Sequence, residues 1–255
     1  MLEDYLAQDK WRQWETMIGH LPIQPEQSVL DLGCGPGLVS ARLAARCQRL
    51  IGVDRESTFL DFARQHCPSK CQFIEAGLAD FDARSVGAVA PVDGLWSSFV
   101  AAYFPTFAPV LARWVSCLAP GGWLAIIEID DLLTGHRPLP EDTNNAFQEF
   151  TDYARSHDHY DFRMGGRLAE ICRAVGLSVV SQHSFKDREL AFDGAAPPEI
   201  QAAWSARFAR MHGMKAYFGS DRFDQLTESF LSTLSSSDHV SATSVQMVIA
   251  KRLLP

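Results

Sequence analysis

Three glycines at alternate positions follow an apolar run near the start of the chain. Residues 28–37 read Ser-Val-Leu-Asp-Leu-Gly-Cys-Gly-Pro-Gly, a pattern that predicts a buried strand, a tight turn and the start of a helix. Gly33, Gly35 and Gly37 have no Cβ, so a ligand can lie directly against the backbone there. Dinucleotide-binding folds use the different spacing G-x-G-x-x-G. A nicotinamide oxidoreductase is therefore an alternative that the spacing disfavours.

Two acidic residues accompany this loop. Asp31 lies two residues before Gly33, where a carboxylate is unfavourable beside a phosphate and favourable beside an ammonium. Asp54 ends the next apolar run, residues 50–54, and a carboxylate at the tip of a second strand can accept hydrogen bonds from both hydroxyls of a ribose. A ligand with an amino-acid end and a nucleoside end fits these residues.

On these residues the chain resembles the class I S-adenosylmethionine-dependent methyltransferases. The run from Asp31 to Gly37 resembles the family's first motif, and Asp54 resembles its ribose-binding acid. The resemblance covers most of residues 29–176 and a last strand near Val245. It implies S-adenosylmethionine as cofactor, with S-adenosylhomocysteine as product. It also implies cofactor contacts at Asp31, Gly33, Cys34, Gly35, Gly37, Asp54, Arg55, Leu78, Ala79, Asp80, Ser97 and Ser98.

One position departs from the family pattern. The family often places an acid after its third strand, against the adenine, but Gly77 stands near that position. The nearby Leu78, Ala79 and Asp80 are the substitutes that the sequence offers.

The acceptor half of the site is less well defined. Tyr103 follows the expected fourth strand, where the family's acceptor face lies, and is the candidate catalytic residue. Glu128, Asp130 and His183 are further candidates for a base. The residues expected to bind the substrate are Tyr103, His136, Tyr160, Trp204 and Phe208. Each of these side chains has a purely structural role as its alternative.

The residues at the carboxyl end of the expected fourth strand narrow the range of possible methyl-transfer reactions. Residues 96–99 read Trp-Ser-Ser-Phe, where amide and amine methyltransferases often carry Asn/Asp-Pro-Pro-Tyr. The expected activity is therefore methyl transfer to an oxygen, nitrogen or carbon of a small molecule, which is an in-line displacement. We expect a partly aromatic or apolar acceptor. The alternative is a catalytically silent S-adenosylmethionine-binding module that acts through a partner.

Alternating strand and helix patterns must position these residues. Strands are predicted at residues 29–32, 50–54, 72–75, 93–97, 123–129, 177–181 and 245–250. This alternation predicts an α/β fold, a parallel sheet with helices on both faces. The resemblance implies its doubly wound, mostly parallel seven-stranded form with an antiparallel last strand, here with helical cap insertions. We expect an N-terminal helical lid at residues 1–27, a cofactor-binding core at 28–185, a helical cap at 186–243 and the last core strand at 244–255. Two amphipathic helices indicate the cap, the second with Ser220 as N-cap.

Bulk properties exclude several classes of protein. The net charge of the 255-residue chain is −8 and no dense basic stripe is visible, so no nucleic-acid partner is expected. Residues 94–112 carry no charge but include prolines and serines, which favours a buried strand and helix over a membrane span. Charged residues interrupt the N-terminus, so we expect a cytoplasmic protein. The sequence does not determine the oligomeric state.

The cysteines predict free thiols rather than disulfides. Cys67 and Cys71 follow His66 in a weak metal-binding pattern, but there is no second pair of ligands. Zinc sites usually need one, so no metal is expected.

Overall fold

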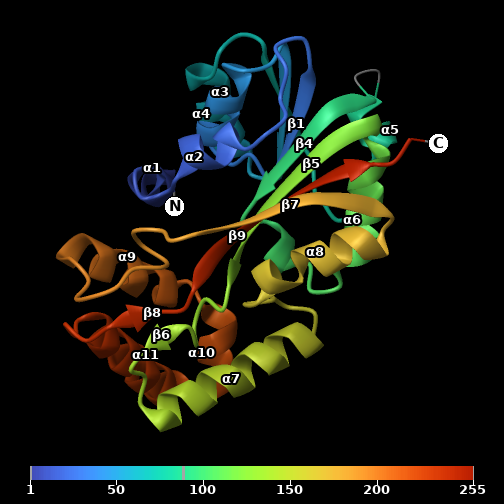
Figure 1. The fold of residues 1–255 in the computed structure, drawn as a ribbon. Helices are drawn as coiled ribbons and strands as arrows, with labels where there is room; N and C mark the ends of the chain where they lie inside the picture. The colour runs from blue at the N-terminus through green and yellow to red at the C-terminus, as the bar shows by residue number, and fades with distance from the viewer. Residues whose placement is uncertain (1, 88–89, 255) are drawn as a thin grey trace.

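A seven-stranded sheet forms the centre of the molecule. The computed structural model describes residues 2–87 and 90–254, and these form a sheet of strand order β3-β2-β1-β4-β5-β9-β7 (Figure 1). The strands are β1 (Ser28–Leu32), β2 (Arg49–Asp54), β3 (Cys71–Glu75), β4 (Val92–Ser98), β5 (Leu118–Asp130), β7 (Leu177–Phe185) and β9 (Ser244–Arg252). The pairs from β3 to β5 are parallel, and β9 runs antiparallel to both β5 and β7. The predicted mostly parallel sheet is confirmed.

Helices cover both faces of this sheet. They are α3 (Leu38–Ala44), α4 (Ser57–His66), α5 (Ala83–Val86), α6 (Phe107–Ser116) and α8 (Met164–Ala174). Successive strand residues alternate between two hydrophobic clusters: Trp96 belongs to one, whereas Leu95 belongs to the other. Strands buried on both faces have this near-continuous apolar sequence, and the doubly wound arrangement follows from it.

Two strand boundaries differ from the sequence-based expectation by more than two residues. β5 begins at Leu118 rather than at Trp123, because the Pro-Gly-Gly segment forms a bulge where the pairing with β4 shifts between Val92 and Gly94. β7 extends to Phe185, since its pairing with β9 continues to Val245.

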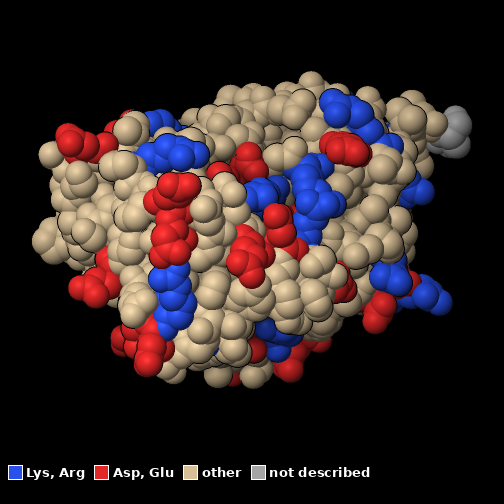
Figure 2. Space-filling view, turned by 90° about the horizontal axis from the view of Figure 1, so that it is seen from below, with Lys and Arg blue, Asp and Glu red and all other residues tan. Residues whose placement is uncertain are grey.

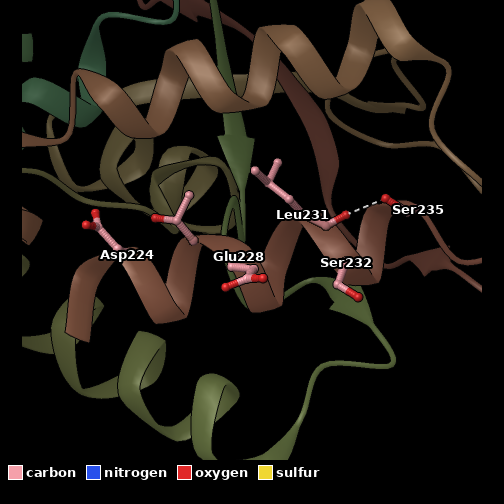
Figure 3. A pocket seen from close by; sticks show the side chains of 6 residues that line it. Asp224, Glu228, Leu231, Ser232 and Ser235 are labelled. Atoms are coloured by element: carbon pink, nitrogen blue, oxygen red, sulfur yellow. Dashed lines mark hydrogen bonds between the residues drawn. The ribbon is translucent and has the colours of Figure 1, made fainter. Parts of the chain in front are cut away.

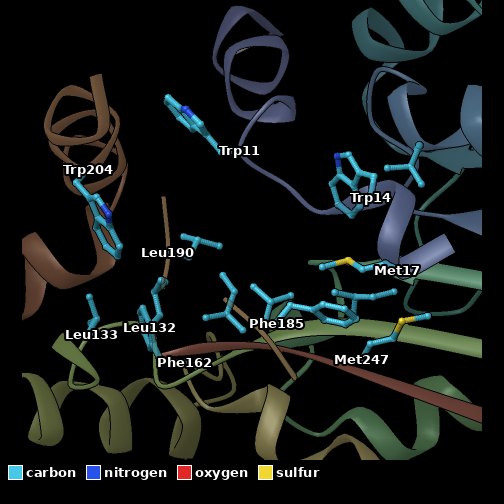
Figure 4. Close-up of a cluster of buried hydrophobic side chains, with 14 of the residues drawn as sticks. Trp11, Trp14, Met17, Leu132, Leu133, Phe162, Phe185, Leu190, Trp204 and Met247 are labelled. Atoms are coloured by element: carbon cyan, nitrogen blue, oxygen red, sulfur yellow. The ribbon is translucent and has the colours of Figure 1, made fainter. Parts of the chain in front are cut away.

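The N-terminal segment packs against the core through its second half. It contains α1 (Leu2–Asp9) and α2 (Trp14–Gly19). No described residue of α1 is buried, whereas Trp11, Trp14 and Met17 are. In Figure 4 these three side chains lie over buried residues of the sheet and of the region that follows β7, among them Phe185 and Trp204.

A helical cap extends beyond one end of the sheet. It contains β6 (His136–Arg137), α7 (Glu141–Ser156), α9 (Pro198–Ala209), α10 (His212–Phe218), α11 (Ser220–Leu234) and β8 (Val240–Ser241). The first two elements follow β5 and the others follow β7, yet β6 pairs with β8. The hydroxyls of Thr143 on α7 and Ser229 on α11 lie 2.7 Å apart. The cap therefore draws on two separate stretches of chain, only one of which the expected range 186–243 includes.

The predicted N-cap of α11 is wrong by one residue. Gly219 is the N-cap and Ser220 is the first helical residue, with no capping hydrogen bond from a side chain. Gly219 has a φ of 76°, and this left-handed backbone, which glycine tolerates best, turns the chain between α10 and α11.

None of the helices within the described ranges is both long enough and apolar enough to cross a bilayer.

Candidate active site

Most of the predicted cofactor residues lie at the carboxyl ends of three neighbouring strands, and the others follow β3. β2, β1 and β4 are adjacent and parallel, with Leu32 paired to both Val53 and Ser97. The N–H groups of Gly33 and Cys34 donate to the carbonyl of Val53 at 2.8 and 3.0 Å. These bonds fix the start of the glycine loop to the end of β2. Ligands of open α/β sheets bind at such a strand edge.

The space around each glycine of the loop differs. Gly33, Gly35 and Gly37 all have positive φ values. A Cβ at Gly33 would lie 2.2 Å from Cγ2 of Val100, and one at Gly37 would lie 2.7 Å from Sγ of Cys67. A Cβ at Gly35 would meet nothing within 4 Å. The loop is therefore packed at both ends and open in the middle, where a ligand can approach the backbone.

Asp54 is held rigidly beside this opening. Its carboxylate accepts hydrogen bonds from the N–H of Gly35 at 2.8 Å and from the N–H of Glu56 at 3.0 Å. Each carboxylate oxygen can accept a further bond, so Asp54 can still bind hydroxyls of a ligand. Arg55 is exposed next to it.

Asp31 is an acid in an unusual environment. Its side chain is buried and accepts a 2.6 Å hydrogen bond from the Ser40 hydroxyl. Burial raises the pKa of Asp31 to about 7; the Ser40 bond opposes the shift, and the negative charge of Asp54 adds to it. A bound ammonium would stabilise the ionised form, so these residues fit the amino-acid end of S-adenosylmethionine.

The residues expected near the adenine are already partly engaged. The carbonyls of Leu78 and Ala79 accept hydrogen bonds from the Trp114 indole at 2.9 Å and from the Arg113 guanidinium at 2.8 Å. The Asp80 side chain is 92% exposed. Leu78 and Ala79 thus fix the turn after β3, whereas Asp80 is directed to solvent.

The two serines of β4 make structural hydrogen bonds. The Ser97 hydroxyl is buried and donates to the carbonyl of Leu32 at 3.0 Å, and the Ser98 hydroxyl accepts from the Trp96 indole at 3.2 Å. These bonds hold the end of β4 against β1.

Tyr103 and Tyr160, which were expected at the acceptor side, lie near Glu128. The rings of Tyr103 and Tyr160 meet edge to face with centroids 5.1 Å apart. Glu128 is buried at the end of β5 and accepts hydrogen bonds from the N–H groups of Ala102 and Ile129. Burial raises the pKa of Glu128 to about 7. Burial and the charge of Glu128 also raise the pKa of the Tyr160 hydroxyl, whereas the charge of Arg207 opposes that shift.

The other expected substrate residues lie inside the cap. His136 is fully buried, with Nδ1 3.0 Å from Nε2 of His239. Trp204 is fully buried and donates from its indole to the carbonyl of Glu189 at 2.8 Å. Phe208 meets Phe230 edge to face in the same interior. These three side chains fill the cap core, and the structure does not bring them to the strand tips.

The remaining candidate bases are dispersed. His183 on β7 stacks on His20, with ring centroids 3.9 Å apart. Asp130 is half-buried at the end of β5, where the N–H of Gly166 hydrogen-bonds to it.

A buried ionic network connects the N-terminal segment to the cap, and sequence reasoning missed it. The guanidinium of Arg12 donates to Asp187 at 2.9 Å and to Glu189 at 2.5 Å. Arg207 donates from Nη2 to the other oxygen of Glu189 at 2.6 Å, and its Nε is buried without a hydrogen-bond partner in the described structure. Asp187 and Glu189 stand in the charged run at positions 186–189, which resembles an exposed segment, and their partners lie far apart in sequence.

Two surface features lie apart from this site. On the face in Figure 2, basic and acidic side chains are interspersed rather than gathered into a basic stripe. Figure 3 shows an open groove of about 450 Å³ along α11, lined by Asp224, Thr227, Glu228, Leu231, Ser232 and Ser235. None of these six residues belongs to the strand tips, so the groove is not the candidate active site.

Comparison with known families agrees with this geometry. Residues 29–122 match the family model described as a methyltransferase domain. These residues form a class I S-adenosylmethionine-dependent methyltransferase domain. The chain is 34% identical over 122 residues to trans-aconitate 2-methyltransferase of Azoarcus sp. strain BH72, covering 47% of this chain and 46% of that protein. It is 37% identical over 111 residues to the Streptomyces coelicolor protein of the same name, covering 43% and 36%. The chain spans about half the length of the curated relatives it matches.

Solved structures share the fold over nearly the whole chain. Cyclopropane synthase MmaA2 from Mycobacterium tuberculosis aligns with a TM-score of 0.59 at 16% identity, covering 94% of this chain and 82% of that one. Haemonchus contortus phosphoethanolamine N-methyltransferase 2, in complex with S-adenosyl-L-methionine, aligns with a TM-score of 0.55 at 18% identity, covering 95% and 53%. At such identities the likeness extends the methyltransferase fold beyond the matched domain and says nothing of the substrate.

Proposed function

We propose that the protein transfers a methyl group from S-adenosylmethionine to a small-molecule acceptor. The arrangement at the tips of β1 and β2 carries this proposal. There Asp54 is hydrogen-bonded to the N–H of Gly35, Asp31 is buried close enough for the two charges to interact, and a Cβ at Gly35 would meet no atom within 4 Å. This set suits a ribose, an ammonium and the chain that joins them.

The chain's own residues supply binding, orientation and shielding. When bound, S-adenosylmethionine supplies a methyl group on a positively charged sulfur. Asp54 accepts the ribose hydroxyls, Asp31 compensates the ammonium, and the glycine loop lies against the methionine end. Positioning of the two reactants can provide much of the acceleration of an in-line displacement. The cap and the N-terminal segment limit the access of water.

A carboxylate-bearing acceptor is the first class to test. The relatives are named trans-aconitate 2-methyltransferases, and a carboxylate needs no base before it attacks a methyl group. Arg207 supports this choice, because its Nε lacks a partner and its charge acts on Tyr160 beside the strand tips. Glu128, with its pKa near 7, could accept a proton from a neutral acceptor instead.

Calorimetry with S-adenosylhomocysteine tests the cofactor site. Asp54→Ala should weaken binding by about 1.5–3 kcal/mol, because it removes a charged hydrogen-bond acceptor. Glu228→Ala, which removes an exposed acid on α11 away from the strand tips, is the matched control and should bind as the parent does. Equal affinity of the Asp54 variant and the parent would contradict the assignment.

Turnover distinguishes an enzyme from a silent binding module. The protein is incubated with S-adenosylmethionine and either trans-aconitate or its amide, and release of S-adenosylhomocysteine is measured. We expect faster release with the carboxylate. Tight cofactor binding without turnover on any small-molecule acceptor would favour the module that acts through a partner.

A further inference from the structure

A thiol packs directly against the glycine loop. Cys67 follows α4, and its Sγ–H donates to the carbonyl of Gly37 at 3.3 Å. The packing is tight, since a Cβ at Gly37 would lie 2.7 Å from this sulfur and 2.9 Å from Cβ of Ala63. Gly37 is the residue at which α3 begins. A movement of the Cys67 sulfur would therefore displace the glycine loop at Gly37.

A second thiol meets the first across a tight turn. The N–H of Cys71 donates to the carbonyl of Pro68 at 2.9 Å, which closes the connection between α4 and β3. The thiols of Cys67 and Cys71 share a hydrogen bond, and both residues are partly exposed. A small oxidant in solution can therefore reach the pair.

The two thiols differ in reactivity from each other and from the remaining four. The hydrogen bond from Cys71 lowers the pKa of Cys67, and the same bond raises the pKa of Cys71. The other cysteines, Cys34, Cys47, Cys117 and Cys172, are buried, and burial raises the pKa of each. An accessible thiol of low pKa beside a second thiol is the arrangement found in redox-sensing proteins.

A metal does not account for the pair. Within residues 2–87 and 90–254, no group of three or more potential ligands is placed to hold a metal ion.

We propose that Cys67 and Cys71 are a site of reversible oxidation by hydrogen peroxide, and that the resulting disulfide weakens cofactor binding through Gly37. The sulfur of the Cys67 thiolate attacks one peroxide oxygen, the O–O bond breaks, and water leaves after protonation. The sulfur of Cys71 then attacks the Cys67 sulfenic acid, an S–S bond forms, the S–O bond breaks, and a second water leaves. The two thiols lose two electrons and the peroxide gains them. A thiol reductant reverses the reaction by exchange.

The disulfide would act on the loop through one lost contact. It removes the S–H that donates to the Gly37 carbonyl and draws the Cys67 sulfur toward Cys71. This consequence rests on the proposed function, whereas formation of the disulfide does not.

The experiment combines disulfide mapping with cofactor affinity. The full chain is treated with hydrogen peroxide, and peptides are mapped by mass spectrometry without reduction. Affinity for S-adenosylhomocysteine is measured by calorimetry before oxidation, after it, and after dithiothreitol. We expect a Cys67–Cys71 disulfide and a fall in affinity of about 3- to 10-fold, the effect of one weakened hydrogen bond, restored by the reductant.

Serine variants separate the steps. Cys67→Ser keeps a hydroxyl donor for Gly37 and should bind the ligand as the untreated parent does, both before and after peroxide. Cys71→Ser should stop at the sulfenic acid, which dimedone traps at Cys67. The matched control Cys172→Ser alters a buried thiol on α8 and should respond to peroxide as the parent does.

Three outcomes would overturn the proposal: no disulfide at several equivalents of peroxide, a disulfide between Cys67 and Cys34, or a Cys67–Cys71 disulfide that leaves affinity unchanged. If the reduced protein does not bind S-adenosylhomocysteine at all, the proposed function fails instead. The disulfide map and the melting temperature of the oxidised protein then decide whether the thiol pair is a redox site.

Discussion

Single residues at the strand tips are held in different ways, and Asp31 and Asp54 show the contrast. The Asp54 carboxylate accepts hydrogen bonds from two backbone N–H groups, and its side chain is half-exposed beside Gly35. Asp31 has one hydroxyl donor and is buried. Asp54 is therefore suited to bind hydroxyls, whereas Asp31 is suited to bind a positive charge.

Replacing Asp31 by asparagine should stabilise the ligand-free protein at alkaline pH. Because burial raises the pKa of Asp31 to about 7, its ionisation costs folding free energy above that pH, and the cost vanishes below the unfolded-state value of about 4. Differential scanning fluorimetry should show a higher Tm for Asp31→Asn at about pH 8 and a shrinking difference toward about pH 4. Asp80→Asn should show no such trend, and a parallel trend in both variants would refute the explanation.

The same substitution should weaken S-adenosylhomocysteine binding at about pH 8, because the ammonium loses a charged partner worth roughly 1.5–3 kcal/mol. Calorimetry at that pH measures it. A neutral asparagine that binds the ligand as tightly as Asp31 would place the ammonium elsewhere.

Local sequence was enough to predict the glycine loop and the strand tip that carries Asp54, but not where the expected acceptor residues lie. Gly33, Gly37 and Asp54 depend on a turn and a strand tip, which short-range pattern determines. Trp204 was predicted as substrate-binding because its helix has an apolar stripe, and periodicity does not tell which surface a stripe covers. The structure buries it in the cap.

At the scale of elements, Arg12 joins the segment between α1 and α2 to the region after β7. Its side chain is only 6% exposed, and its partners Asp187 and Glu189 are buried as well. Burial alone would raise the pKa of Glu189, but the charges of Arg207 and Arg12 outweigh it and lower that pKa. The contribution of this pairing to the free energy of unfolding is therefore present above the unfolded-state pKa of Glu189, about 4.5, and is lost as the pH falls below that value.

Arg12→Gln should destabilise the protein by about 3–5 kcal/mol, because it leaves buried carboxylates without a partner. Chemical denaturation at neutral pH measures the loss. Adding Glu189→Gln should recover part of it if the two residues interact as described. The exposed Arg84→Gln is the control. Strict additivity of the Arg12 and Glu189 substitutions would argue against the network.

Trp204→Ala tests the cap core. Trp204 is fully buried against Phe230, with ring centroids 4.9 Å apart, so its removal should cost about 3–5 kcal/mol of stability. Denaturant titration measures this, with the half-exposed Val180→Ala as control. An unchanged stability together with a raised acceptor KM would instead place Trp204 at the substrate.

At the scale of the whole molecule, cap and sheet share one interior. A single hydrophobic cluster runs from Trp11 through Trp204 to Ile249, and β6–β8 pairing joins the two stretches of the cap. Short helices with one apolar face are rarely stable alone. We therefore expect thermal unfolding in one transition. Limited proteolysis that released a folded fragment of residues 186–243 would show an independent domain instead.

The sequence predicted the sheet better than the cap for a physical reason. Strands buried on both faces leave long apolar runs, and the late run at residues 245–250 matched the antiparallel β9. The cap depends on β6, two residues long, and on contacts between α7 and α11. Such short and distant pairings leave no periodic signal.

The position of β9 also has a consequence for synthesis on the ribosome. β9 follows the cap in the chain, yet it lies between β5 and β7, and β7 has no other neighbour in the described sheet. In a nascent chain that has emerged only as far as the cap, one edge of β5 and both edges of β7 lack a pairing strand. Unpaired strand edges invite association between chains, and long-range strand pairing is slow. The interval before β9 emerges is thus when this protein is most exposed to aggregation, and a chaperone that delays association would act on that interval rather than on the finished fold.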